Sequence, residues 1–599
     1  MSEQARPLRT AVLVKQVPPY ESSLTLDGHG RLERATLPAE MNAWCRRAVT
    51  RAVQLARASG GHVTAVTMGP PGAADVLREA LACGADAAVH VSDPALAGAD
   101  CLITARALAA ALRTLPPLDV VVTGHSSTDG ATGALGPMVA ALLDLPHAGP
   151  VLTLERDGPR TLHALLQHDT AATDVEIRLP AVISVAERSC TAAKAPPESW
   201  PSTARITALD LKALPGARPA SAGPTHVLAT RAVTTTRHPV LLDGGTAQAD
   251  RLFDLISERL AGPCDEPGPP VRPWGGAPAD GPAVLVVTAA PTSTGTRALV
   301  GEAARIAGQV DGHVVVACPE PCPPDRLSSW GADRVLRLAS RSARPVARAL
   351  TRWARDHGLP RVVLGASTDW DREVLGRLGT HLDSGLMSDL TGLRLQSAPP
   401  CLVGTKPAAG VLADITARGP VCVATLHTGS LPLHATRPSR PVPVHDLDIR
   451  ADPALRTLRT HPGDDHDALE RAGVVIGLGA GVPVDAYGEL ATLRALWGAE
   501  LAATRKVTDT GALAHGRQLG VTGRSVSPHL YLALGISGSH DHLVGVERAR
   551  TVVAVNHDPQ APIFRHCDIG LLADWRDTVR ALTARAARHP RAGHAVAPR

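Results

Sequence analysis

No stretch of this sequence approaches the roughly 18 consecutive apolar residues that a membrane-spanning helix requires. The N-terminal sequence MSEQARPLRTAVLVKQV also lacks the apolar core and the small-residue cleavage site of a secretory signal peptide. These two absences argue against a membrane span and against export. We therefore expect a soluble, cytoplasmic protein.

A concentrated basic patch is missing as well. The chain has 61 basic and 57 acidic residues, which gives a formal net charge of +4, and these charges are spread along its length. Only five of the basic residues are lysine, and aromatic residues make up 2% of the chain. Because no basic block is interleaved with aromatic side chains, nucleic acid is not expected as a partner.

Cysteines do not form a metal-binding pattern. Ten cysteines are scattered over 599 residues, and Cys318 and Cys322, in CPEPC, are the only close pair. No second pair completes a zinc site. Ordinary thiols in a reducing compartment are the simpler interpretation, and a metal or redox role is the alternative.

Two parts of the chain resemble each other. HVTAVTMG…GADAAVHV, from His62, and HVVVACPE…GADRVLRL, from His313, both run from an apolar strand through a proline-containing turn and a helix to another strand. LDVVVTG from Leu118 and LPRVVLG from Leu359 form a second matched pair, each followed by a polar loop and a helix. Short apolar strands that alternate with helices indicate parallel α/β sheets. The sequence therefore predicts two homologous domains.

Stretches rich in proline and glycine separate the expected domains. A third unit begins near Gly473 with VVIGLGAGVP, a strand that enters a glycine-rich turn. We expect the α/β class, with two homologous parallel-sheet, nucleotide-binding-like domains and a C-terminal doubly wound domain. The expected division is a domain at 1–260, a linker at 261–282, a domain at 283–435, a hinge or linker at 436–471, a domain at 472–590 and a tail at 591–599.

The segment from 519 to 545, LGVTGRSVSPHLYLALGISGSHDHLVG, admits three interpretations. GISGS resembles the nucleophile elbow G-x-S-x-G, but Ser539 stands where the second glycine belongs. His540 and His542 could bind a metal, but a site needs more ligands, and nothing fixes Asp541 or His566 as partners. A cradle for a nucleotide cofactor is the third interpretation.

Several features favour the cradle. Residues 520–523 and 537–539 are turns of small residues that allow close backbone approach to a ligand. Arg505 follows one strand and could neutralise a phosphate. Asn556 and Asp574 follow later strands and suit contacts with ribose or adenine. We therefore favour a nucleotide cofactor in the third unit.

Long motifs carry a resemblance to a known family. TGRSVSPHLYLALGISGSHDHLVG from Thr522 and VAVNHDPQAPIF from Val553 resemble the FAD-binding domain of the electron transfer flavoprotein α subunit. SGLMSDLTGL and KPAAG…VATLHTG resemble the preceding domain of that subunit. LVKQVPP, MNAWC, ALACGAD and RLPAVISV resemble the β subunit. The resemblance implies a β-then-α fusion in one chain, hence a monomeric pseudo-heterodimer with residues 261–282 as the fusion linker.

The resemblance implies a function and a set of FAD contacts. It implies a relay that takes electrons from a FAD-linked dehydrogenase and passes them to a quinone oxidoreductase or another redox protein, without substrate chemistry of its own. It also implies that Thr522 lies near flavin N5, and that His542 offers a donor or positive charge near flavin O2. The matching cofactor-binding residues are Thr504, Arg505, Leu519, Gly520, Val521, Thr522, Ser537, Gly538, Ser539, His540, Asp541, His542, Asn556 and Asp574.

The β subunit of this family also binds a nucleotide, either AMP or, in electron-bifurcating members, a second FAD. STDGATGALGP keeps the Asp-Gly and Gly-Pro of the bifurcating pattern, but Ala131 and Ala134 replace an aspartate and a glutamine. These losses favour AMP, or no nucleotide, over a second FAD. The residues of this possible second site are Asn42, Met68, Gly124, Asp129, Gly130 and Thr132.

The sequence also departs from the family near the expected flavin. The family's G-G-R-G arginine is replaced by Gly479 or Ala480, its glutamine by Val521, and a second arginine by His427. These losses support an alternative function, a nucleotide-binding or regulatory module that has lost flavin chemistry. The resemblance further places a dehydrogenase-docking loop at residues 186–206 and a hinge for the flavin domain at residues 436–471.

Overall fold

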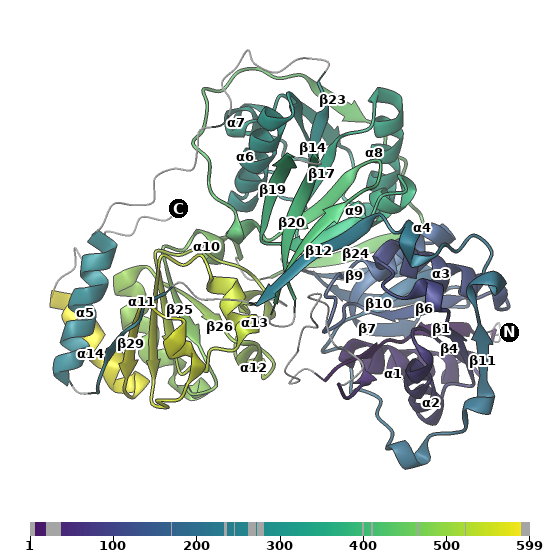
Figure 1. Cartoon of the computed structure of the whole chain (residues 1–599), viewed down its shortest axis with the longest axis horizontal. Coiled ribbons are helices and arrows are strands. Elements are labelled where there is room, and N and C mark those ends of the chain that lie inside the picture. Colours follow the sequence, from purple (N-terminus) through teal and green to yellow (C-terminus); the bar gives the residue numbers. More distant parts are fainter. Residues whose placement is uncertain are drawn as a thin grey trace.

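The computed structural model describes residues 6–19, 37–168, 171–232, 237–244, 246–261, 271, 281–397, 400–408, 411–463, 466–520 and 523–588. Three α/β units are visible in Figure 1, each built on its own main sheet. The expected α/β class with several parallel sheets is confirmed. Most of the expected linker at 261–282, together with Val521 and Thr522, lies outside the described residues.

The first unit is built on a ten-stranded sheet in the order β11-β5-β4-β1-β6-β10-β7-β8-β9-β24, parallel as far as β7 and antiparallel beyond it. Its strands are β1 (Arg9–Leu13), β4 (His62–Met68), β5 (Ala87–Val91), β6 (Val120–Gly124), β7 (His147–Arg156), β8 (Thr161–Gln167), β9 (Ala171–Arg178), β10 (Ala181–Val185), β11 (Ile206–Leu209) and β24 (Leu455–Pro462). The helices are α1 (Ala43–Arg57), α2 (Ala74–Ala82), α3 (Cys101–Thr114) and α4 (Leu135–Leu143), and β2 (Gln16–Val17) pairs with β3 (Glu40–Met41). The central strand β6 is almost wholly buried and reads VVVTG, as expected for a parallel strand covered on both faces.

The second unit repeats this order. Its seven-stranded parallel sheet runs β18-β22-β17-β14-β15-β16-β23, so β14 and β17 hold the central places that β1 and β6 hold in the first unit. The strands are β14 (Ala283–Val287), β15 (His313–Pro319), β16 (Arg334–Leu338), β17 (Val362–Ala366), β18 (Leu386–Leu390), β22 (Cys422–Leu426) and β23 (Val444–Leu447). The helices are α6 (Thr294–Gln309), α7 (Pro324–Trp330), α8 (Ala343–His357) and α9 (Asp369–His381). The shared strand order agrees with the duplication read from the sequence.

The third unit has a six-stranded parallel sheet in the order β13-β29-β28-β27-β25-β26. Its strands are β13 (Val240–Leu242), β25 (Val474–Leu478), β26 (Glu500–Ala503), β27 (Leu530–Leu534), β28 (Thr551–Asn556) and β29 (Ile569–Leu572). The helices are α5 (Thr246–Ala261), α10 (His466–Arg471), α11 (Ala491–Trp497), α12 (Arg505–Thr508), α13 (His540–Leu543) and α14 (Trp575–Arg588). The strand order reverses between β25 and β27, and open α/β sheets bind ligands beside such a switch point.

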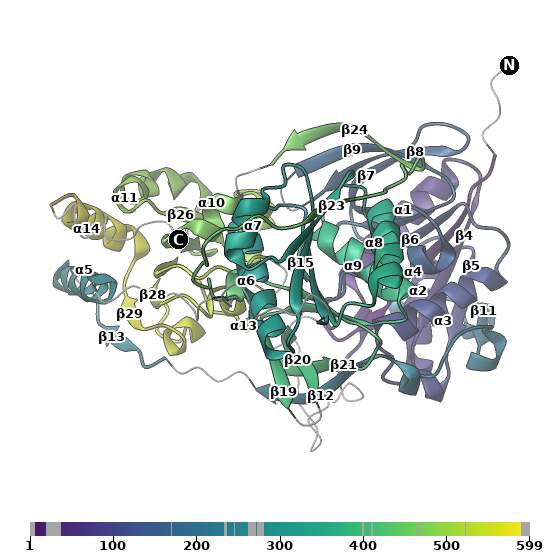
Figure 2. The same cartoon turned by 90° about the horizontal axis from the view of Figure 1, so that it is seen from above.

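Strands are exchanged between the two halves of the chain. A second, antiparallel sheet of the second unit joins β19 (Gly392–Ser397), β20 (Pro400–Ala408) and β21 (Val411–Ala417) to β12 (Thr225–Ala232), which comes from the N-terminal half. In return, β24 pairs with β9 of the first unit (Figure 2). Farther on, β13 and α5, also from the N-terminal half, pack against β29 and α14 of the third unit.

The expected hinge at 436–471 carries regular structure, namely β23, β24 and α10. As a domain boundary it stays a prediction. The first two units also share a hydrophobic core, in which helices α3 and α4 pack against α8 and α9, with Leu108, Val139, Leu350 and Val374 among its members. The two homologous units therefore form one packed body. Within the described part of the chain, no helix is long and apolar enough to cross a membrane.

Candidate functional site

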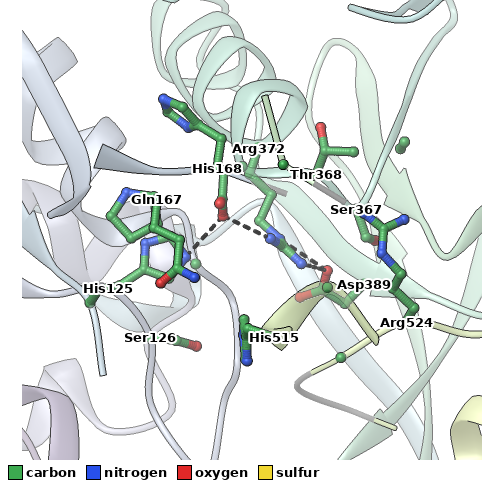
Figure 3. Close-up of a pocket in the computed structure, with 18 of the residues that line it drawn as sticks. His125, Ser126, Gln167, His168, Ser367, Thr368, Arg372, Asp389, His515 and Arg524 are labelled. Carbon is green, nitrogen blue, oxygen red and sulfur yellow. Dashed lines mark hydrogen bonds and ion pairs between the residues drawn. The ribbon is translucent and has the colours of Figure 1, made fainter. Parts of the chain in front are cut away.

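A cavity of about 350 Å³ lies where the three units meet (Figure 3). Its walls come from the ends of β6, β17 and β22, from β18, from the facing ends of β8 and β9, from β24, and from two loops of the third unit. Carboxyl ends of parallel strands are where α/β folds bind ligands. Pockets that hold cofactors and other small molecules have volumes of this order.

A chain of charged groups crosses this cavity from the first unit to the second. His125, which follows β6, has its Nε2 3.1 Å from Oδ1 of Asp369 at the start of α9. The Arg372 guanidinium lies 3.4 Å from Asp369 and 2.8 Å from Asp389 (Figure 3). Burial alone would raise the pKa of Asp369, but His125 and Arg372 lower it overall. Asp369 is therefore held as a carboxylate between two units.

Lys406 extends this network away from the cavity. Its Nζ donates to the Ser388 carbonyl at 3.0 Å and to the Ala131 carbonyl at 3.3 Å, and it lies 3.8 Å from Asp389. Burial lowers the pKa of Lys406, while Asp389 opposes that effect. Because Ala131 belongs to the first unit and Lys406 to the second, this hydrogen bond also fixes the 125–134 loop against its neighbour.

Two serines of the cavity wall have hydroxyl groups with which no described residue pairs. Ser367 follows β17 and Ser525 follows the loop that contains Gly523, and both residues line the cavity. The Oγ atoms of both are buried, and within the described part of the chain neither has a hydrogen-bond partner. Buried polar atoms are normally paired with protein, water or ligand groups. A polar ligand therefore fits this space.

The third unit contacts the first beside the cavity through charged side chains. Arg505, at the start of α12, forms an ion pair with Glu187, and its guanidinium lies over the Trp44 ring at 5.6 Å from the centroid. Arg188 lies 2.6 Å from Asp509. Trp44, Glu187 and Arg188 all line the cavity. Arg505, which the sequence interpretation assigns to a phosphate, thus contacts the first unit here.

The two loops singled out in the third unit do lie together. Gly520 has φ +127°, and a Cβ at this position would stand 2.2 Å from the Asp541 carbonyl oxygen. The Gly520 N–H also donates to the Arg524 carbonyl at 3.0 Å, which links this loop to the cavity wall. Gly538 has φ +88° and approaches the backbone of Ile563. Only glycine allows these backbone contacts at positive φ.

His542 differs from the sequence expectation. It is 3% exposed; its Nδ1 lies 3.2 Å from the Leu519 carbonyl, and its Nε2 lies 2.7 Å from the Tyr531 hydroxyl. Burial lowers the pKa of His542 to about 4. The ring is therefore neutral at pH 7, with Nδ1–H donating to Leu519 and Nε2 accepting from Tyr531. Burial thus disfavours a positive charge on this ring. The role of His542 as a donor or positive charge beside the flavin stays a prediction.

The remaining cofactor residues lie at the carboxyl edge of the third sheet. Thr504 occupies the position before α12, and Ser537 and Ser539 are exposed after β27. Asn556, at the end of β28, donates to the Ile536 carbonyl at 2.9 Å and accepts from the Asp558 N–H at 2.9 Å. The exposed Asp574 accepts from the Arg576 N–H at 2.8 Å, near the start of α14. The ends of β26, β27 and β28 thus flank the switch point, although none of these side chains lines the cavity.

The possible second site also gathers at one sheet edge. Lys15 Nζ lies 2.6 Å from Asp129 and donates to Ser127 Oγ at 3.3 Å, and Asn42 donates to the Ser126 carbonyl at 2.8 Å. The Gly130 N–H donates to Asp129 at 2.7 Å, Thr132 lies 3.7 Å from Cys101, and Met68 and Gly124 end β4 and β6. The polar side chains of this loop are largely bonded to one another.

Several cavity residues were missed by the sequence analysis. His125 follows β6 of the first unit, and Asp369 and Arg372 lie in the first turn of α9, after the equivalent strand β17 of the second unit. Trp44 comes from α1 of the first unit and His515 from the third unit. One signal was visible, since His125 and Ser367 each stand shortly after the glycine near the end of a buried strand, in GHSS and GAST. No sequence pattern indicates that the three units pack together around this cavity.

Comparisons with known proteins agree with this architecture. The sequence profile of the electron transfer flavoprotein domain matches residues 30–214 and 286–452, and that of the electron transfer flavoprotein FAD-binding domain matches residues 468–547. The chain is 31% identical over 284 residues to the electron transfer flavoprotein subunit alpha of Mycobacterium leprae, which covers 45% of this chain and 87% of that protein. It is 33% identical over 235 residues to protein FixB of Bradyrhizobium diazoefficiens, covering 38% and 63%. It is 31% identical over 268 residues to protein FixB of Salmonella typhimurium, covering 43% and 85%.

Proposed function

Since this chain belongs to the electron transfer flavoprotein family and carries that family's FAD-binding domain, we propose that it accepts electrons from partner dehydrogenases and passes them to a quinone oxidoreductase or another redox protein. The observation that supports this most directly is the cavity where the FAD-binding unit meets the two homologous units, with Ser367 and Ser525, whose buried hydroxyl groups have no hydrogen-bond partner among the described residues, in its wall. FAD, when bound, would supply the electron-accepting and electron-donating chemistry.

The chain's own residues would hold and shield the cofactor. We propose that the turns at 519–523 and 537–542 cradle it at the switch point of the third sheet, with Asn556 and Asp574 toward its adenosine. Ser525 would donate or accept a hydrogen bond from the cavity side, where its Oγ is buried. Trp44, which also lines the cavity, would exclude water from one side of it. His542, being neutral, would act by holding Leu519 in place.

The test of FAD binding uses the purified full-length protein. We expect a yellow protein that releases about one equivalent of FAD per chain on denaturation, as a single FAD-binding domain implies. The Ser525→Ala variant should bind FAD more weakly, because it loses the hydroxyl on the cavity wall. A colourless protein that FAD cannot reconstitute would contradict the proposal and favour the module without flavin chemistry.

We further propose that the chain is a fusion of a β-like half and an α-like half that works as a monomer. The electron transfer flavoprotein domain profile matches the chain twice, once in each half, and β12 and β24 are exchanged between the halves. Both observations support this proposal. In the β-like half we propose AMP, or no nucleotide, in preference to a second FAD, because Asp129 is already paired with Lys15 and Asn42 is bonded to the Ser126 carbonyl. Chromatography of the released nucleotides tests this, and two FAD per chain would contradict it.

Donor docking is proposed at residues 186–206. Glu187 and Arg188 at the start of this loop contact the third unit, while Lys194 and Glu198 farther along are exposed. The double charge reversal Lys194→Glu, Glu198→Lys should slow reduction by the cognate dehydrogenase and leave reduction by dithionite unchanged. A charge reversal at the exposed Lys212, outside the loop, is the control. Equal slowing in both variants would exclude this docking surface.

Movement of the third unit would need a narrower hinge than residues 436–471. Because β24 pairs with β9 of the first unit over Leu455–Pro462, that part of the segment belongs to the packed body. We therefore propose that the unit turns about the residues between β24 and β25. Substrate oxidation by the purified protein alone, at enzymatic rates, would contradict the relay as a whole.

A further inference from the structure

Two cysteines of the second unit stand in direct contact, away from the proposed FAD site. Cys318, near the end of β15, is buried, and Cys322, in the turn before α7, is half-buried. Their Sγ atoms lie 3.3 Å apart, with Cys318 donating to Cys322. Among the described cysteines no other two sulfurs are in hydrogen-bonding contact. Among the described residues, no group of three or more His, Cys, Asp and Glu side chains is arranged to hold a metal ion.

The turn that joins the two cysteines is held by charged side chains. The Cys322 N–H donates to the Glu320 carboxylate at 2.8 Å, and Arg337 lies 3.2 Å from the same carboxylate. Arg341 donates to the Glu320 carbonyl at 2.8 Å. These hydrogen bonds and ion pairs hold the turn in the conformation that brings the two sulfurs into contact. A disulfide needs sulfurs about 2.05 Å apart, so they must approach by only about 1.3 Å.

The hydrogen bond between the sulfurs also shifts the pKa values of the two thiols in opposite directions. It lowers the pKa of Cys322, which accepts it, and raises the pKa of Cys318, which donates it. Burial raises the pKa of Cys318 further. The thiolate is the reactive form of cysteine. Cys322, the less buried of the two, is therefore the better nucleophile. Cys318 is the cysteine that reacts second.

We propose that Cys318 and Cys322 form a redox-active dithiol that exchanges with low-molecular-weight disulfides. The Cys322 thiolate attacks one sulfur of the incoming disulfide, forms a mixed disulfide and releases the first thiolate, which takes up the proton that Cys322 lost. Cys318 then attacks the Cys322 sulfur, and its proton goes to the second departing thiolate. The two cysteines are oxidised to one disulfide, and the incoming disulfide is reduced to two thiols.

The position of this pair connects it to the cavity. Besides Glu320, Arg341 donates to the Ala289 carbonyl at the end of β14, at 2.8 Å. The Arg341 carbonyl in turn accepts from the Trp370 indole at 2.6 Å. Trp370 directly follows Asp369, the carboxylate that faces the cavity. One hydrogen-bonded arginine therefore separates the dithiol turn from the cavity wall.

The test uses the full-length protein in mixtures of reduced and oxidised glutathione, followed by acid quenching, alkylation and mass spectrometry. We expect an internal disulfide in the peptide that contains Cys318 and Cys322. Cys83 is the comparison, because it is half-buried like Cys322 but burial raises its pKa. Modification of Cys322 should be faster than that of Cys83, because the pKa of Cys322 is lowered and that of Cys83 is raised.

Two variants separate the steps of the exchange. Cys318→Ser should accumulate glutathione on Cys322, because the second attack is lost. Cys322→Ser should leave the buried Cys318 unmodified. The proposal is overturned if the wild-type peptide stays a dithiol while Cys322 reacts no faster than Cys83. Failure of FAD binding would leave this result untouched, since the wild-type measurement reads only the masses of the cysteine peptides.

Discussion

The buried His542–Tyr531 pair predicts that the third unit loses stability in mild acid. In the folded unit the pKa of His542 is about 4, against an ordinary value of 6.5. Between these two pH values the unfolded chain binds more protons than the folded one, so stability rises with pH across this window and falls as the pH drops from about 6.5 to about 4. The interval of about 2.5 pH units, at about 1.4 kcal/mol each, gives a loss of at most about 3.5 kcal/mol.

Native-state hydrogen exchange is the suitable assay, because the unfolding of a three-unit chain is not a two-state process. Peptides covering β27 report the opening free energy of the third unit at each pH, after correction for the intrinsic exchange rate. The His542→Asn variant keeps a donor for the Leu519 carbonyl but cannot take up a proton. We expect it to lose most of the pH dependence between 4 and 6.5.

Other histidines of the unit provide the control. Burial also lowers the pKa values of His540 and His566, so a shallower slope should remain in the variant. His540→Asn should remove less of the slope than His542→Asn, because His540 is only partly buried. If the His542→Asn protein keeps the full wild-type slope, the assignment of a neutral, proton-excluding His542 is refuted.

Three further substitutions test other contacts. Gly520→Ala should abolish FAD binding, because its Cβ would lie 2.2 Å from a backbone oxygen at φ +127°, whereas Gly488→Ala, with open space around it, should bind FAD normally; flavin absorbance measures both. Glu187→Gln should weaken the contact of Arg505 with the first unit by about 1 kcal/mol, because the pair is partly exposed, and exchange of the α12 amides should rise several-fold. Asn42→Ala should destabilise the first unit by about 1–3 kcal/mol, because it leaves the partly buried Ser126 carbonyl without its donor; native-state hydrogen exchange of peptides covering β6 checks this.

Local patterns were enough to predict the repeated strand-and-helix units of the first two domains and several strands of the third. β6 and β17 are runs of β-branched and leucine residues that end at a glycine and a polar loop, and each is followed by a helix, as the sequence indicates. The two loops around Gly520 and His542 were also predicted as a pair. Both belong to motifs whose residues lie close together along the chain.

Pairing over long distances was not predictable in this way. β24 pairs with β9 across almost 290 residues, for example at His461 and Ala172. The sequence of neither strand indicates which strand it pairs with. The neutral state of His542 depends on Tyr531 and on burial, which no spacing reveals. The cavity, likewise, exists only because three units close around it.

The exchange of β12 and β24 has a consequence for how the chain is made. The sheet of the first unit stays incomplete until the ribosome has added residues 455–462. Likewise, β12 has no partner strand until residues 411–417 have been synthesised. The free edges of β9 and β12 therefore stay unpaired until late in synthesis. The same interlocking should let two polypeptides, divided between residues 261 and 281, assemble as a stable complex when they are produced together.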